Sequence, residues 1–173
     1  MTTHTLSVLV ENKPGVLAHV AALFSRRAFN ITSLSVGPTT DERVSRMTIV
    51  VDGASTPIDQ VHKQLEKLVR VLKVVELEPD AAVERELALI KVGVRPGTRT
   101  ALLDVAAAFR AEVVDLGDDT LVLEAVCAPG ALDALLERLA PYGIRELART
   151  GQVAVARGSW VMTDSETLAG AAA

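Results

Sequence analysis

The segment VLVENKPGVLAHVAALFSRRAFNI, residues 8–31, decides which fold the chain is expected to adopt. Residues 4–10 alternate between two faces, which is the period-two pattern of a half-buried strand. A polar turn, Asn12-Lys13-Pro14-Gly15, follows, and the apolar side chains of residues 16–27 then recur at helical spacing. Pro14 suits the first helical turn, where its missing N–H is not needed. The segment therefore predicts a strand, a tight turn and a helix.

The rest of the first half completes one α+β unit. Two β-branched runs, 31–37 and 47–51, flank a polar connection and predict an antiparallel strand pair. An amphipathic pattern over 58–68 predicts a second helix, and 71–77 predicts a closing strand. The order βαββαβ is typical of a ferredoxin-like unit, an antiparallel sheet with both helices on one face. We therefore predict a first domain over residues 1–78.

The same order of elements restarts in the second half. A charged run at 84–86, predicted to be solvated, marks the boundary, and a Pro-Gly pair again stands between a strand and a helix, at 96–97 as at 14–15. The predicted elements are a strand at 87–94, a helix after Pro96-Gly97, strands at 111–116 and 121–126, a helix at 132–139 and a strand at 144–149 that 153–156 extends. This predicts a second ferredoxin-like domain over 84–158 and a poorly ordered tail over 159–173.

The composition favours a cytoplasmic protein with aliphatic cores. Hydrophobic residues make up 49% of the chain and aromatic residues 3%. The net charge of −4 argues against nucleic acid and anionic membranes, which bind clustered Lys and Arg. The single cysteine, Cys127, cannot form an intrachain disulfide, which fits a reducing compartment and a small core side chain. No apolar run reaches the about 18 residues of a membrane span.

The first turn has the groups needed to bind a free amino acid. The N-terminus of a helix exposes unpaired N–H groups and carries about half a positive charge, so residues 15–17 can receive a carboxylate. Gly15 has no Cβ to block a close approach. The side-chain amide of Asn12 can accept from an ammonium group or donate to a carboxylate. The alternative is that Asn12 only turns the chain and Pro14-Gly15 only starts the helix.

Asn30 is a second candidate, between the first helix and the next strand. Asparagine also tolerates turn dihedrals, so a purely structural role stays open. In a ferredoxin-like unit, however, the second strand lies at a sheet edge, and exposed edges are commonly covered or paired. If two copies pair there about a two-fold axis, Asn30 of one copy comes near the turn at 12–15 of the other. The candidate site then lies between two copies of the chain.

Several stretches of the chain carry a family resemblance. They are LSVLVENKPGVLAHVAALFSRRAFNI (6–31), SRMTIVV (45–51), KQLEKLVRVLKV (63–74), ERELALIKV (84–92) and the closing GQVAVARG (151–158). These stretches resemble the small regulatory subunits of acetolactate synthase, also called acetohydroxyacid synthase. The similarity covers residues 5–158, and the first half resembles an ACT domain, a module that senses amino acids.

The resemblance implies a non-catalytic subunit in the biosynthesis of the branched-chain amino acids valine, leucine and isoleucine. Such a subunit binds and activates a large catalytic subunit, confers feedback inhibition by valine, and forms a homodimer through its ACT domains. It carries no cofactor, and thiamine diphosphate, Mg and FAD are expected on the catalytic subunit. The implied effector-binding residues are Asn12, Gly15, Val16 and Leu17 of one subunit with Asn30 and Ile31 of its neighbour.

Two details of the resemblance stay open. The sequence does not choose among valine, leucine and isoleucine, because a methylene changes binding by only about 1–3 kcal/mol. Ala28 stands where the family usually has glycine. If that residue needs a positive φ, alanine costs on the order of 1 kcal/mol there.

Other functions of this topology fit less well. An RNA-recognition motif would need aromatic side chains on the central strands, and a small phosphatase would need an arginine in the first loop. The scattered His4, His19 and His62 do not predict a metal site, and no catalytic motif is present. Arg95 and Arg99 in the second Pro-Gly turn are more simply solvated charges than an anion site. The main rival is a free-standing ACT-type sensor that acts on another enzyme or regulator.

Overall fold

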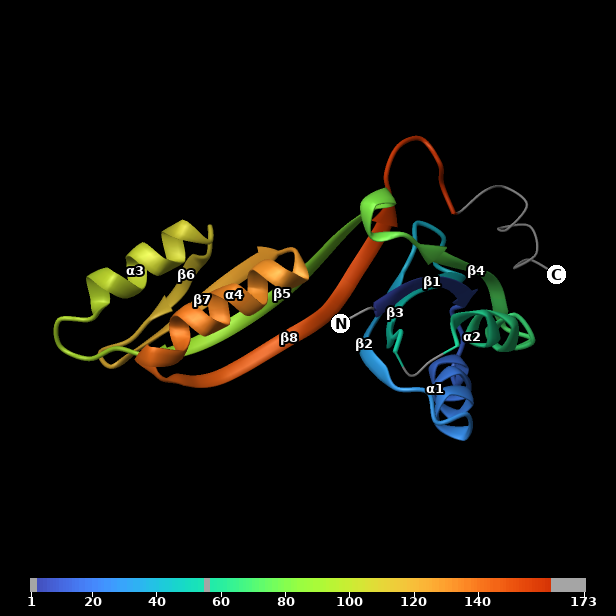
Figure 1. Cartoon of the computed structure of the whole chain (residues 1–173), viewed down its shortest axis with the longest axis horizontal. Helices are drawn as coiled ribbons and strands as arrows, with labels where there is room; N and C mark the ends of the chain where they lie inside the picture. The colour runs from blue at the N-terminus through green and yellow to red at the C-terminus, as the bar shows by residue number, and fades with distance from the viewer. Residues whose placement is uncertain (1–2, 55–56, 163–173) are drawn as a thin grey trace. The chain divides into compact units, whose positions relative to one another are not determined.

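The computed structural model describes residues 3–54 and 57–162, and it divides into two compact units (Figure 1). The first unit comprises the described residues up to Val83 together with those from Gln152 onward, and the second comprises Glu84–Gly151. Each unit contains a four-stranded antiparallel sheet with two α-helices. The predicted α+β class, with two ferredoxin-like units, is confirmed.

The first unit follows the predicted order of elements. These are β1 (Thr3–Glu11), α1 (Val16–Arg26), β2 (Ile31–Pro38), β3 (Val44–Asp52), α2 (Ile58–Leu65), β4 (Val71–Leu77) and a 3-10 turn at Pro79–Ala81. The strand order in the sheet is β2-β3-β1-β4, so β2 lies at an edge, as predicted. Pro14 precedes the capping residue Gly15, so its predicted place in the first helical turn is wrong, and the helix begins two residues later.

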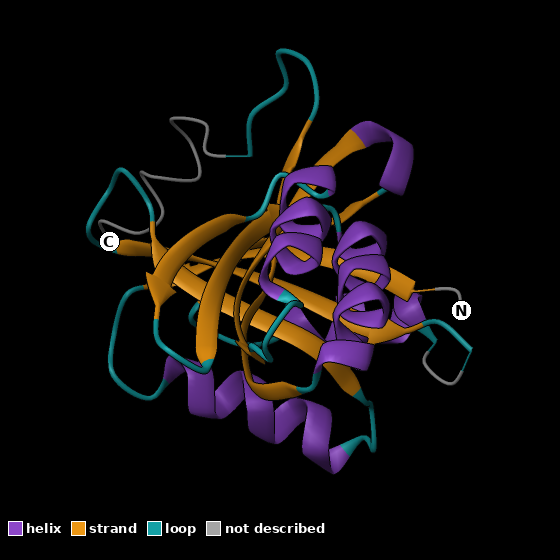
Figure 2. Ribbon diagram, turned by 90° about the vertical axis from the view of Figure 1, so that its left-hand side faces the viewer, coloured by secondary structure: helices purple, strands orange, loops and turns teal. Residues whose placement is uncertain are grey.

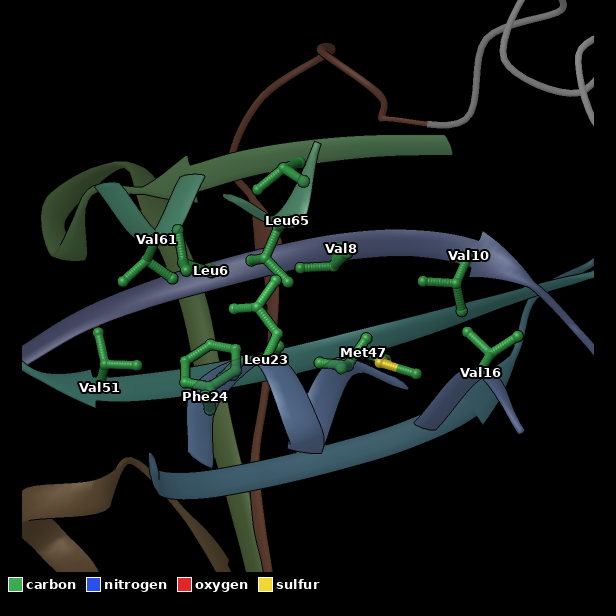
Figure 3. Packing of buried hydrophobic residues seen from close by; sticks show 13 residues of the cluster. Leu6, Val8, Val10, Val16, Leu23, Phe24, Met47, Val51, Val61 and Leu65 are labelled. Carbon is green, nitrogen blue, oxygen red and sulfur yellow. The ribbon is translucent and has the colours of Figure 1, made fainter. Parts of the chain in front are cut away.

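The core of the first unit lies between its sheet and its two helices. Strand residues Val8 and Met47 meet Phe24 of α1 and Leu65 of α2 (Figure 3). All four side chains are 1% exposed or less. One of the two faces predicted from the alternation of residues 4–10, the face of Leu6, Val8 and Val10, therefore packs on the helices.

The opposite face of the same sheet is covered as well. Thr5, Ser7 and Leu9, which alternate with the core residues on β1, are also buried. Leu9 packs with Val44 and with Met162, which follows the last strand. The prediction that this strand is half-buried is therefore wrong, because the face opposite the helices is buried too even though Thr5 and Ser7 on it are polar.

The position of residues 152–162 differs from two expectations for the C-terminal part of the chain. Met162 is buried, so the prediction of a poorly ordered tail does not hold for residues 159–162, and 163–173 lie outside the described residues. Residues 152–158, predicted to close the second domain, group with the first unit, where the N–H of Arg157 donates to the carbonyl of Ala81 at 2.8 Å. Pairing between distant residues gives no local signal in the sequence.

The second unit repeats the topology. Its elements are β5 (Ala82–Gly93), α3 (Arg99–Ala108), β6 (Glu112–Leu116), β7 (Thr120–Cys127), α4 (Pro129–Leu139), a 3-10 turn at Ala140–Tyr142 and β8 (Ile144–Ala156), and the strand order is β6-β7-β5-β8. Helices and strands are distinguished by colour in Figure 2. The first residues of β5 and the last residues of β8 belong to the first unit. The internal repeat predicted from the Pro-Gly pairs is therefore a repeat of the whole unit.

An ion pair between a buried carboxylate and a partly exposed arginine stabilises the second unit. Arg149 donates from Nε and Nη2 to the two carboxylate oxygens of Glu86 at 2.8 and 2.7 Å, and from Nη1 to Asp133 at 3.3 Å. The hydrogen bond to Glu86 raises the pKa of Arg149. Glu86 is 4% exposed, so the prediction that this charged run is solvated is wrong at Glu86. Burial raises the pKa of the neighbouring thiol, Cys127, which packs partly buried against the second core.

The first helix of each unit ends in the same way. After α1, the N–H of Phe29 donates to the carbonyl of Phe24 at 3.0 Å, and after α3 the N–H of Ala111 donates to Ala106 at 2.9 Å. This is the Schellman motif, which requires a left-handed residue just before that donor. The residues in that position are Ala28, with φ 55°, and Arg110, with φ 56°. The positive φ considered for Ala28 is therefore present.

Candidate functional site

The turn between β1 and α1 is held in place by hydrogen bonds from distant parts of the first unit. The backbone N–H of Asn12 donates to the carbonyl of Arg43 at 2.7 Å, and its side-chain Nδ2 donates to the carbonyl of Glu42 at 2.8 Å. On the other side, Nη1 of Arg70 donates to the carbonyl of Pro14 at 3.0 Å. Asn12 therefore has a structural role, and its Oδ1 remains as an acceptor.

The segment that supports Asn12 is itself tightly bonded. The carboxylate of Asp41 accepts hydrogen bonds from the backbone N, the Nε and the Nη2 of Arg43, at 2.9, 3.0 and 2.6 Å. These bonds, chiefly the side-chain ones, lower the pKa of Asp41 to about 2. The turn at 41–43 is therefore a fixed platform for the Asn12 side chain at neutral pH.

The start of α1 is open to a ligand. Gly15 is the capping residue with φ 86°, it contributes no capping side chain, and a Cβ built on it would meet nothing within 4 Å. The N–H of His19 makes the first helical bond, to the carbonyl of Gly15 at 3.0 Å. The N–H groups before it have no partner carbonyl within the helix, as at every helix start. Only Val16 has a long bond, 3.4 Å, to the carbonyl of Lys13.

The helix N-terminus and the guanidinium of Arg70 are the positive groups at this turn that could bind an anion. Nζ of Lys13 is paired with the carboxylate of Glu11 at 3.0 Å. The first turn of α1 contains no acidic residue that would compete for its N–H groups. A carboxylate placed here would meet backbone N–H groups and the positive end of the helix dipole.

The predicted side chains of this turn differ in exposure. Val16 is buried in the first core, so it offers only its backbone to a ligand. Leu17 is 45% exposed and is available as an apolar contact. The helical pattern alone did not separate these two neighbours.

Asn30 and Ile31 lie at the far end of α1 in the same chain. Glu11 pairs with Val44 at one end of β3, whereas Ile31 pairs with Val51 near its other end. Extended chain from 44 to 51 spans about 23 Å, so one copy does not bring the two halves of the predicted site together. Asn30 is exposed, and its side chain has no hydrogen-bond partner in the part of the chain that the structure describes.

The edge of the first sheet offers a way to join two copies. Strand β2 pairs with β3 on one side only, and its Val36 is 44% exposed. Exposed strand edges commonly pair or are covered. Ile31 begins this edge strand and packs partly buried against the first core.

Some residues that shape the site were missed by sequence reasoning. Arg70, which holds the carbonyl of Pro14, and the turn at 41–43 that receives Asn12 are about 30 to 56 residues away along the chain. Within residues 3–54 and 57–162 no cluster of three or more His, Cys, Asp or Glu side chains is arranged to hold a metal ion. None of the described helices is long and apolar enough to cross a membrane.

Comparison with known proteins gives matches over both units. Residues 6–73 match the family model of the AHAS small subunit-like ACT domain, and residues 85–158 match the model of the small subunit of acetolactate synthase. The chain is 56% identical over 156 residues to the acetolactate synthase small subunit of Mycolicibacterium smegmatis, covering 90% of this chain and 92% of that one. It is 49% identical to a probable small subunit of Archaeoglobus fulgidus, with coverage of 90% and 98%.

A solved structure also matches the chain over most of its length. The crystal structure of the acetolactate synthase small subunit from Thermotoga maritima superposes with a TM-score of 0.84 at 38% identity, covering 92% of this chain and all of that one. Sequence and fold thus match the same family over nearly the whole length of the chain. The chain belongs to the family of acetolactate synthase small subunits, which are regulatory subunits.

Proposed function

We propose that two copies of this chain bind valine between their first units and thereby control the activity of an acetolactate synthase catalytic subunit. The observation that carries the proposal is the open start of α1 at Gly15, next to the fixed side chain of Asn12. It offers unpaired N–H groups to a carboxylate and an amide oxygen to an ammonium group.

The apolar part of the ligand has a place in the same arrangement. Leu17 is the exposed apolar side chain beside the helix start, and Ile31 of the second copy would face it. Asn30 of the second copy would supply a further hydrogen bond. A branched aliphatic side chain fits such a border, which supports valine, leucine or isoleucine over a polar amino acid.

The distance between the two halves of the site supports a dimer. Because about 23 Å of strand β3 separates the end of the sheet near Asn30 from the turn of the same chain, Asn30 can contact that turn only in another copy. If the β2 edges of two copies pair about a two-fold axis, Asn30 of each copy comes close to the turn of the other copy. The dimer would then contain two equivalent sites.

The catalytic subunit is the proposed partner. It would carry the chemistry, with thiamine diphosphate, Mg and FAD, while this chain carries no cofactor. Valine would change how the subunits of the complex pack and so weaken activation. Coupling of this kind is reciprocal and typically about 1–3 kcal/mol, so the catalytic subunit would also change the affinity for valine.

The first test is calorimetric titration of the full chain with valine, leucine, isoleucine and serine. Asn30→Ala should weaken the binding of the preferred amino acid about ten- to hundredfold, because it removes a hydrogen bond to a charged group. Thr32→Ala, an exposed neighbour on β2, is the matched control and should bind normally. Equal affinities for Asn30→Ala and the unchanged chain would remove Asn30 from the site.

A second test separates the rival sensor function. A free-standing sensor would bind the amino acid but would not retain the acetolactate synthase catalytic subunit on an affinity column or raise its activity. Retention and activation, both reduced by valine, are expected here. Valine binding without retention would favour the rival.

A further inference from the structure

A cavity lies in the first unit, on the sheet face that turns away from α1 and α2. Its volume is about 230 Å³. Its floor is formed by Ser7, Arg46 and Leu77 from three neighbouring strands, and its cover includes Val155 and Trp160. The cavity is smaller than the about 300–1,000 Å³ of pockets for drug-sized ligands, so an occupant would be no larger than an amino acid.

The hydroxyl group of Ser7 is the first sign that this cavity has an occupant. Ser7 is 1% exposed, and its Oγ has no hydrogen-bond partner among the described residues. A buried polar group without a partner costs about 1–3 kcal/mol. A ligand in the cavity would supply the missing hydrogen bond.

Arg46 is the second sign. In the β1–β3 register, Ser7 lies opposite Thr48 and Leu9 opposite Arg46, so Ser7 and Arg46 are diagonal neighbours on one face. Burial lowers the pKa of the Arg46 guanidinium, and no carboxylate in the described part of the chain pairs with it. By contrast, Asp41 raises the pKa of Arg43.

The remaining lining restricts the ligand. Met162 and Val161 add apolar surface, and none of the lining residues is acidic. An ammonium group would therefore meet a cation and no counter-charge. Arg46 also borders a more open hollow beside Pro38–Thr40, so its guanidinium is reachable from solvent.

We propose that this cavity binds a small aliphatic monocarboxylate that lacks an ammonium group, with its carboxylate on Arg46 and Ser7 and its alkyl part against Trp160 and Met162. A guanidinium group suits a carboxylate because the two form paired, charge-assisted hydrogen bonds. The site is distinct from the turn at Asn12–Leu17, which lies at the end of β1 and next to α1. The protein would thus sense an organic acid as well as an amino acid.

The chain provides its own reporter for this site. Trp160 is the only tryptophan in the sequence. It lines the cavity, and Nζ of Lys73 lies 5.9 Å from the centroid of its ring. A ligand bound against this indole should change its fluorescence.

The experiment is a fluorescence titration of the full chain with 3-methylbutanoate, and with 3-methylbutanamide as the uncharged match. The acid should give a saturable change, and the amide a change at least about tenfold weaker. Arg46→Gln should weaken binding of the acid about ten- to hundredfold, and Arg95→Gln, an exposed arginine of the second unit, should have no effect. Saturating valine should not displace the acid.

Ser7→Ala distinguishes a ligand contact from a structural role. The variant removes an unpaired buried hydroxyl, so the ligand-free protein should unfold at the same temperature or higher. The rise in unfolding temperature that the acid causes should nevertheless be smaller than in the unchanged chain. Equal titrations for the unchanged chain and Arg46→Gln, no saturable signal, or phosphate binding as tightly as the acid would overturn the proposal.

Discussion

The two Pro-Gly turns of the molecule share the conformation of their glycine but differ in where the following helix begins. Both contain a glycine with positive φ, 86° at Gly15 and 82° at Gly97. In the first turn the helix begins directly after the glycine. In the second it begins two residues later, after Thr98, whose Oγ1 accepts from the N–H of Arg95 at 3.0 Å and donates to its carbonyl at 2.9 Å.

This difference explains why the repeat of a motif is not a repeat of a site. In the second turn Thr98 satisfies the N–H and the carbonyl of Arg95, and Nη2 of Arg99 donates to the carbonyl of Gly117 at 3.2 Å. The first turn is instead fixed by Arg70 and by the carbonyls that receive Asn12, although no side chain caps either helix start. What distinguishes the first turn is therefore the fixed amide of Asn12 beside the helix start, and a Pro-Gly pair alone does not identify a ligand site.

The largest expected effect tests this comparison directly. Gly15→Asp should weaken valine binding at least about a hundredfold, because it puts a like charge against the carboxylate. Gly97→Asp has the same backbone requirement and the same open space, so its strain of about 1–2 kcal/mol should be similar. Calorimetry should show normal valine binding by Gly97→Asp. If that variant also lost valine binding, damage to the fold would be the cause.

A second prediction concerns the ion pair between Arg149 and the buried Glu86 in the second unit. Arg149→Met leaves Glu86 buried without its partner and should destabilise this unit by about 2–3 kcal/mol, less than a fully buried pair because Arg149 is partly exposed. Arg145→Met removes an exposed pair with Asp119 and should cost about 0–1 kcal/mol. Amide hydrogen exchange measures the change in stability of each unit separately. Equal effects of the two substitutions would argue against burial as the cause.

A third prediction uses the feature that the two units share. Ala28→Gly and Arg110→Gly should each stabilise their own unit by about 0.5–1 kcal/mol, because glycine adopts the positive φ without strain. The controls are Ala21→Gly and Ala107→Gly inside the helices, which should destabilise by about 1 kcal/mol. Denaturation monitored by hydrogen exchange measures the stability of each unit, so it detects both the expected stabilisation and the expected destabilisation. Destabilisation by all four substitutions would mean that the left-handed residues are not strained.

The smallest effect is expected at Thr98. Thr98→Val keeps the shape of the side chain and removes both hydrogen bonds to Arg95, so it should destabilise the second unit by about 0.5–1 kcal/mol. Thr100→Val, on the exposed side of α3, should change stability less. Hydrogen exchange at the N–H of Arg95 would report the loss. Unchanged exchange would mean that Thr98 does not close the turn.

Most helices and strands were predicted because their signals are local. Alternation over 4–10 and helical spacing over 16–27 each reflect how neighbouring side chains face a core. The start of β5 at Ala82 was missed, since its first residues pair outside the unit to which the rest of the strand belongs. The burial of Glu86 was missed for the same reason, because its partner Arg149 is 63 residues away.

The sequence by itself determined the order of the elements, the repeat of the unit and the open glycine turn, because these depend on periodicity and on backbone preferences of nearby residues. It also placed Asn30 at an edge strand. Only the tertiary structure decided that Asn12 donates to Glu42, that Met162 covers the first sheet and that Ser7 and Arg46 share a cavity. These contacts join residues far apart in the chain, and strand register and packing of the whole unit set them.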